Sequence, residues 1–243
     1  MISLEKTQSL LIARSISITD FLTVYIPTVG EILSSDDREY YQMVTTLTSS
    51  PYDLMVQLDD MGIDYEQITD FELFMLLFQS LQNKDLSLIF PGLESSLLKP
   101  AKNNENGQIV LWDAENGIVI DELIYNEICD ALRKIHFTEK PKYKAGNKEA
   151  KKFLIERTRL KQKRQAKKPY RSFLEDLVVA MVNTEEFKYD YRQTMDLTIY
   201  QFNSSVRQIQ RKINYNHVMS GCYFGTVDIK KIDQRELNWL TGE

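Results

Sequence analysis

Two pairs of cysteine and histidine are the first residues in this 243-residue sequence that offer the chemistry of a catalytic or metal site. Cys129 and His136 lie seven positions apart on a predicted helix, so both side chains point the same way, as a thiol nucleophile and its base must. Seven residues at about 1.5 Å each nevertheless separate their backbones by about 10 Å, too far for a direct hydrogen bond. We therefore expect a half-buried cysteine and a surface histidine, neither of them catalytic.

His217 and Cys222 are the second pair, and they supply two of the four ligands that a structural zinc ion normally takes. Cys129 and His136 would complete the set only from a distant part of the chain, and no spacing typical of a zinc motif links the four residues. The sequence therefore predicts no zinc site.

Four carboxylates, Asp59, Asp60, Asp64 and Glu66, cluster around Gly62. Carboxylate oxygens are the ligands of hard cations such as calcium. The order of residues here lacks the alternating ligand positions of a calcium loop, however. We expect a solvated helix end followed by a turn.

Motifs of known catalytic sites are also missing from the sequence. It contains neither of the glycine-rich loops that hold phosphates, G-x-x-x-x-G-K and G-x-G-x-x-G, nor the G-x-S-x-G motif of hydrolases. A hydrolase assembled from dispersed carboxylates is the one enzymatic alternative left open. We expect no catalytic residues, no cofactor and no bound metal, and a protein that is not an enzyme.

Charge is distributed very unevenly along the chain. The formal net charge is −5, but residues 1–132 hold 6 basic and 22 acidic residues (net −16) and residues 133–171 hold 16 and 3 (net +13). Residues 172–243 hold 8 and 10 (net −2). Such asymmetry indicates contact with nucleic acid, with an anionic partner, or between the two oppositely charged parts of the chain.

The basic segment 133–171 is the strongest candidate for a binding surface. Its charge density favours phosphate binding through counterion release, but Tyr143, Phe153 and Tyr170 are too few aromatic residues for a base-stacking platform. A protein contact, with the acidic part of this chain or with an acidic partner, is favoured over nucleic acid. The expected partner-binding residues are Lys148, Lys151, Lys152, Arg157, Arg159, Lys161, Lys163, Arg164, Lys167, Lys168 and Arg171.

Most of the elements that position these residues are predicted to be helices. Residues 8–33 favour short strands or an extended segment, because they alternate and are rich in β-branched residues. Helices are expected after Ser35 and from Pro51. Thr69 and Glu72 have the spacing of a capping box, which starts an apolar helix that belongs at the centre of the fold.

A β-hairpin is predicted over residues 108–121, with Asn116 and Gly117 supplying the positive φ angles of a tight turn. The preceding stretch, residues 100–107, is expected to be a loop. Asp121 is a suitable N-cap for the next helix, whose buried stripe ends at Ile135.

The basic helix is expected to begin after Asn147 and to end before Pro169. Its few apolar residues suffice for a narrow seam and not for a core helix. Those residues are Ala150, Phe153, Leu154, Ile155, Leu160 and Ala166. Ser172 and Glu175 then repeat the spacing of a capping box and start the C-terminal helices.

The predicted fold class is mainly α with a small β-hairpin, built as helical bundle-like units joined by the basic helix. Residues 1–136 form an acidic, mostly helical unit with the hairpin near 108–121. Residues 137–171 form a basic linker and helix, and residues 172–243 form a helical C-terminal unit.

We expect a soluble, cytoplasmic protein. The first apolar stretch, Leu10 to Ala13, is too short for the core of a signal peptide. The longest apolar runs are far shorter than the roughly 20 residues that span a bilayer. Two cysteines give no disulfide framework.

Four stretches of the sequence carry a resemblance to a known group of proteins: VYIPTVGEIL (24–33), PYDLMVQLDD (51–60), AKKFLIER (150–157) and DLTIYQFN (196–203). They resemble uncharacterised proteins of tailed bacteriophages and prophages of Gram-positive bacteria that are encoded among the tail genes and are likened to tail assembly chaperones. The resemblance implies a non-enzymatic role, binding the tape-measure protein or another aggregation-prone tail protein. It carries over no site residues.

Three functions follow as hypotheses. The first is a phage tail morphogenesis protein, a chaperone-like binder of a tail protein, for which the methionine-bearing helices at 43–61 and 174–182 offer either adaptable apolar surface or, more simply, core. The second is a nucleic-acid-binding phage accessory protein acting through segment 133–171. The third is a structural component of the virion, in the tail or baseplate. The sequence leaves the oligomeric state open.

Overall fold

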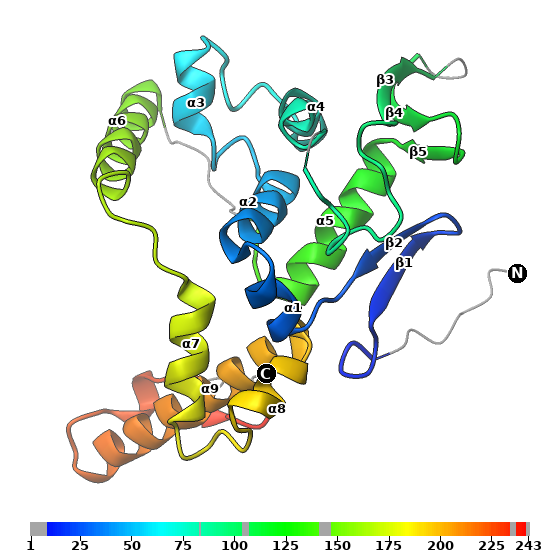
Figure 1. Cartoon of the computed structure of the whole chain (residues 1–243). Coiled ribbons are helices and arrows are strands. Elements are labelled where there is room, and N and C mark those ends of the chain that lie inside the picture. The colour runs from blue at the N-terminus through cyan, green and yellow to red at the C-terminus, as the bar shows by residue number, and fades with distance from the viewer. Residues whose placement is uncertain (1–8, 83, 104–106, 141–146, 234–236, 242–243) are drawn as a thin grey trace, which may run out of the picture.

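The computed structural model describes residues 9–82, 84–103, 107–140, 147–233 and 237–241. About 51% of the chain is helical, and two small antiparallel sheets complete it, which confirms the predicted mainly α class (Figure 1). In chain order the described elements are β1 (Ser15–Thr19), β2 (Leu22–Tyr25), α1 (Val29–Ser34), α2 (Asp37–Thr48), α3 (Met55–Asp60), α4 (Asp70–Leu77), η1 (Phe78–Ser80), β3 (Lys99–Lys102), β4 (Ile109–Asp113), β5 (Ile118–Ile120), α5 (Glu122–His136), α6 (Lys148–Gln165), α7 (Phe173–Val182), α8 (Tyr191–Asp196), α9 (Ile199–Tyr223) and η2 (Ile229–Lys231).

The segment 8–33 is only partly extended. β1 and β2 form the first, two-stranded sheet, as predicted. The prediction was wrong for Val29–Ser34, which forms α1, because Thr28 and Glu31 make a capping box that satisfies the first backbone N–H groups of a helix.

α5 is the central helix of the N-terminal part. Asp121 caps it as predicted, accepting a hydrogen bond from Ile124 N at 2.8 Å. Its buried stripe packs against α2 and α4, where the ring of Tyr125 stacks on Phe74 with centroids 4.6 Å apart. The capping box of Thr69 and Glu72 forms as predicted and starts α4.

The predicted hairpin is part of a three-stranded sheet of order β3-β4-β5. β4 and β5 confirm the hairpin, but Lys99–Lys102 pairs with β4 as a third strand where a loop was expected. In the hairpin turn Gly117 has a positive φ of 68°, whereas Asn116 does not, contrary to prediction. Asn116 instead donates hydrogen bonds to the carboxylate of Asp113, which closes a four-residue turn.

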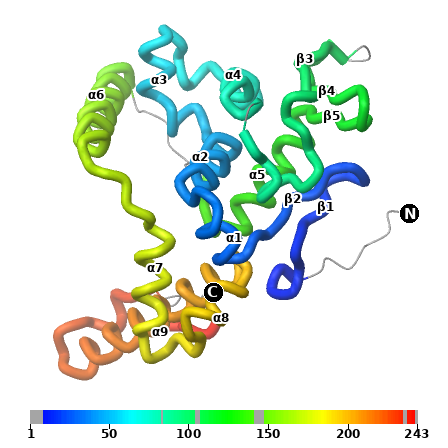
Figure 2. Tube along the Cα trace, in the orientation of Figure 1, coloured from blue at the N-terminus to red at the C-terminus, as the bar shows by residue number. Residues whose placement is uncertain are grey.

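The C-terminal helices α7, α8 and α9 lie below the N-terminal part (Figures 1 and 2). Backbone hydrogen bonds join the two parts, from Val29 N to Leu197 O at 2.9 Å and from Ile199 N to Pro27 O at 2.8 Å. Buried side chains of α7 and α9, such as Phe202, belong to the same hydrophobic core as those of α5. The division into three units stays a prediction, and residues 141–146 of its linker lie outside the described residues.

Gly30 lies where the N-terminal and C-terminal parts pack closely together. A Cβ atom at this position would lie 3.0 Å from Met195 O and 3.1 Å from Met195 Cβ, because α1 packs directly on α8. Gly30→Ala should therefore destabilise the protein by about 1–2 kcal/mol, since overpacking outweighs the gain in helix propensity.

Chemical denaturation measures this effect, and Ser34→Ala is its control. Ser34 is exposed on the same helix, and its replacement should change the free energy of unfolding by no more than about 0.5 kcal/mol. A Gly30→Ala protein as stable as the wild type would contradict the tight packing of α1 on α8.

Candidate functional site

The basic helix α6 is held against α3 by a narrow apolar seam. Asn147 caps it as predicted, accepting a hydrogen bond from Ala150 N at 2.8 Å. Buried Ile155 and half-buried Leu154 join a separate hydrophobic cluster with Met55, Leu58 and Tyr65. The predicted seam was wrong for Phe153 and Leu160, which are 66% and 56% exposed because they lie on the side of α6 that faces away from α3.

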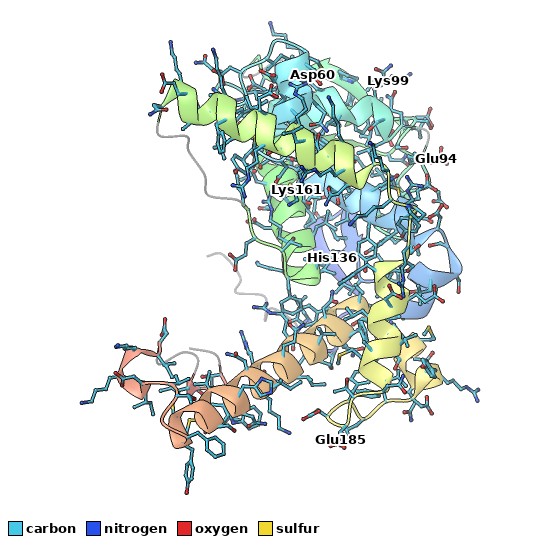
Figure 3. All side chains as sticks on the ribbon, turned by 90° about the vertical axis from the view of Figure 1, so that its left-hand side faces the viewer. Asp60, Glu94, Lys99, His136, Lys161 and Glu185 are labelled. Carbon is cyan, nitrogen blue, oxygen red and sulfur yellow. The ribbon has the colours of Figure 1, made fainter. Side chains whose placement is uncertain are left out.

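Arg159 makes the first ionic contact between α6 and α3. Its guanidinium lies between two carboxylates, with Nη1 2.5 Å from Asp60 Oδ1 and Nη2 2.8 Å from Asp59 Oδ2. The hydrogen bond to Asp60 raises the pKa of Arg159 further above its ordinary value. Figure 3 looks onto α6 and labels Lys161 on this helix and Asp60 on α3 beside it.

Lys151 makes the second contact, two helical turns before Arg159. Its ammonium donates hydrogen bonds to Asp64 and, at 2.9 Å, to Glu66 Oε2, and it lies 4.5 Å from the ring centroid of Tyr65. Burial lowers the pKa of Lys151, but the hydrogen bonds to the two carboxylates outweigh burial and raise it. The hydrogen bond from Lys151 also lowers the pKa of Asp64.

The four carboxylates Asp59, Asp60, Asp64 and Glu66 thus form one surface, the acidic ledge, on which α6 rests. The predicted helix end and turn are confirmed, and the four carboxylate side chains remain 39–56% exposed. The prediction missed that each of them also makes an ion pair with Arg159 or Lys151. Part of the charge asymmetry is therefore balanced within the chain, one of the alternatives that the sequence left open.

The other face of α6 makes no such contact with the described residues. Phe153, Arg157, Leu160 and Arg164 follow one another at intervals of four, three and four residues, so they lie on one stripe of the helix. All four are exposed, and we call them the outer stripe. The helix is therefore two-faced, with its docking residues inside and an apolar and basic stripe outside.

The eleven predicted partner-binding residues differ in their contacts, and Lys167, Lys168 and Arg171 lie beyond the end of α6. Lys151 and Arg159 bind the acidic ledge, and Arg171 pairs with Asp176 at 2.6 Å. The remaining eight are exposed and form no ion pair within the part of the chain that the structure describes. These eight are Lys148, Lys152, Arg157, Lys161, Lys163, Arg164, Lys167 and Lys168.

Cys129 and His136 do not meet. The thiol of Cys129 is buried and donates a hydrogen bond to Leu47 O at 3.2 Å. His136 is not the predicted surface residue, because Nε2 lies 3.0 Å from Tyr40 Oη and the ring contacts Tyr41. Burial lowers the pKa of His136 to about 4, so the ring is neutral at pH 7.

His217 and Cys222 lie on α9, whereas Cys129 and His136 belong to α5. Among the described residues, no three histidine, cysteine, aspartate or glutamate side chains come together in an arrangement that could hold a metal ion. The two pairs therefore do not assemble in this structure into the four-ligand set considered from the sequence.

A groove beside α4 was not foreseen from the sequence. Its volume is about 640 Å³, and it lies between the 63–69 loop, α4 and the start of β4. Ile63, Ile68, Met75, Leu76 and Ile109 supply apolar walls. Three carboxylates, Asp64, Glu72 and Glu122, also line it, so we call it the acid-rimmed groove.

Most methionines of the two methionine-bearing stretches, 43–61 and 174–182, belong to the core. Met43, Met55 and Met181 are buried, whereas Met61 is 59% exposed. Met75 of the acid-rimmed groove is only half-buried, and this position carried no signal in the sequence beyond an all-round apolar helix.

The ion pairs of α6 should make its docking sensitive to salt. We expect the double substitution Lys151→Gln and Arg159→Gln to speed hydrogen exchange of the α6 amides at low salt, because only the short apolar seam then holds the helix. The wild type should approach the same rates at high salt, since screening weakens pairs at the surface.

The matched control is the substitution of Lys163 and Lys167 by glutamine, which removes the same charge from exposed, unpaired positions. Exchange in this control should remain as slow and as salt dependent as in the wild type. Identical exchange in both double variants would show that the acidic ledge does not hold α6.

The neutral His136 should make stability depend on pH. Because burial lowers its pKa from 6.5 to about 4, the stability that the neutral ring provides above pH 6.5 is lost as the pH falls through 4. The loss amounts to about 3 kcal/mol. Denaturation of the wild type and of His136→Gln between pH 7 and pH 4 measures this loss. The free energy of unfolding of the variant should fall by up to about 3 kcal/mol less than that of the wild type. Parallel pH curves would contradict the lowered pKa of His136.

Comparison with known proteins bears on the second half of the chain. Residues 161–242 match the family model for the YomV second domain, a stretch that begins in α6 and includes α7, α8 and α9. No curated protein matches the chain, and no solved structure does. Among the described residues, no helix is long and apolar enough to cross a bilayer. The family match supports a phage or prophage origin, as the resemblance implied.

Proposed function

We propose that this chain is a non-enzymatic phage protein that binds a tail protein, such as the tape-measure protein, before assembly. The observation that carries the proposal is the outer stripe of α6. Phe153 and Leu160 are large apolar side chains held in solvent on a helix whose other face is already docked. Exposed apolar residues grouped with charges are typical of surfaces that bind a partner.

The chemistry of the outer stripe defines the partner segment. Two apolar side chains about 10 Å apart along one helix suit an amphipathic helix that lays its apolar face across them. Arg157 and Arg164 add positive charge beside them, so acidic residues should flank the apolar face of the partner. Such charges speed association and select partners more than they add affinity.

Nucleic acid is the second candidate, because eight cations in and after α6 are free of ion pairs within the described chain. One feature favours protein over phosphate. Phe153 and Leu160 are 66% and 56% exposed among these cations, and a phosphate backbone would leave such apolar side chains without a partner. A structural virion component is a third reading, which detection of the chain in purified particles would support.

Charge reversal on the exposed side of α6 tests the proposal. The variant Lys152→Glu, Arg157→Glu and Lys161→Glu leaves the docking residues untouched. In co-purification with the tail proteins of the same phage, it should retain its partner at least about tenfold less well than the wild type, because the acidic segment is now repelled.

A variant with the same change of charge elsewhere is the control, namely Lys99→Glu, Arg192→Glu and Arg211→Glu, all at exposed positions outside α6. Its partner binding should match the wild type. Capture of a tail protein unaffected by α6 reversal, or capture of DNA or RNA alone with a steep salt dependence, would contradict the proposal.

A further inference from the structure

The acid-rimmed groove is an apolar surface that the described part of the chain leaves open. Leu76 and Ile109, on two of its walls, are 54% and 58% exposed. Glu72 and Glu122 give its edge negative charge, while the third carboxylate there, Asp64, is already paired with Lys151. An occupant must therefore present apolar side chains flanked by positive charge, and a neutral or acidic helix would fit poorly.

The outer stripe of α6 has the matching composition. Phe153 and Leu160 supply two apolar anchors, and Arg157 and Arg164 alternate with them. Both surfaces expose apolar side chains, and their charges are complementary. The outer stripe has basic neighbours, whereas the groove has acidic ones.

The two surfaces of one chain cannot meet each other. α6 lies on one side of α3, whereas α4 and β4 lie on the other (Figures 1 and 2). The inner face of α6 is fixed to the acidic ledge, so the outer stripe points away from the groove of its own chain. Only a second copy can bring the stripe to the groove.

We propose that the acid-rimmed groove binds the outer stripe of α6 from a second copy of this chain. The contact is heterologous, because the two copies use different surfaces, and it adds copies head to tail unless the geometry closes a ring. This goes beyond the function proposed above, in which the groove takes no part. The two share the outer stripe, so self-association and the tail partner compete for it.

Two variants test the contact, and each of them disrupts one of the two surfaces. In the groove variant, Leu76→Arg and Ile109→Arg place positive charge where the basic helix docks. In the stripe variant, Phe153→Lys and Leu160→Lys remove both apolar anchors. All four positions are exposed, so the fold should tolerate the changes, and circular dichroism checks that it does.

Sedimentation velocity of the full chain gives the readout. The wild type should form species larger than a monomer as its concentration rises, and fewer of them at high salt. Each variant alone should remain a monomer. A mixture of the two should form a 1:1 dimer that does not grow, because it contains one intact groove and one intact stripe, while the other pair of surfaces repels.

The control replaces exposed apolar residues outside both surfaces, Phe21→Arg and Leu123→Arg, and it should associate like the wild type. Three results would overturn the proposal: a wild type that stays monomeric at its highest soluble concentration, association that survives in the groove variant, or a mixture of the two variants that stays monomeric. The groove variant also separates the two proposals, because it should still bind the tail partner.

Discussion

The ion pairs between α6 and the acidic ledge determine what this protein can offer to a partner. Two cations, Lys151 and Arg159, neutralise carboxylates on α3 and the turn after it, and Ile155 adds a short apolar contact between them. An isolated 18-residue helix of such composition would be only marginally stable in water. Docking therefore both stabilises α6 and fixes which of its residues face solvent.

This arrangement gives one helix two functions. The inner face uses its charges for intramolecular contacts, whose value at the surface is modest and depends on salt. The outer face keeps exposed cations together with Phe153 and Leu160, a combination suited to an acidic amphipathic segment. Asp64 belongs both to the acidic ledge and to the acid-rimmed groove, because it binds Lys151 and also lines the groove. A molecule bound in the groove would therefore lie next to the site where α6 docks.

Local features were predictable from the sequence, and long-range ones were not. The capping box at Thr69 and the caps at Asp121 and Asn147 depend on residues three positions apart, so their spacing shows in the sequence. Arg159 and Asp59 lie 100 positions apart, and no local pattern pairs them. The third strand, β3, contains Pro100 and reads as a loop, because its hydrogen bonds come from β4. The acid-rimmed groove likewise exists only after α4 and β4 pack together.

Competitive labelling of the lysine amines tests the two-faced helix most directly. Lys151 and Lys152 are neighbours in the sequence, but the side chain of Lys151 is 16% exposed and paired with two carboxylates, whereas Lys152 is exposed. At low salt we expect Lys151 to react much more slowly than Lys152, and we expect the difference to shrink as salt is added. Equal reactivity at low salt would contradict the two-faced helix, because α6 would then not rest on the acidic ledge.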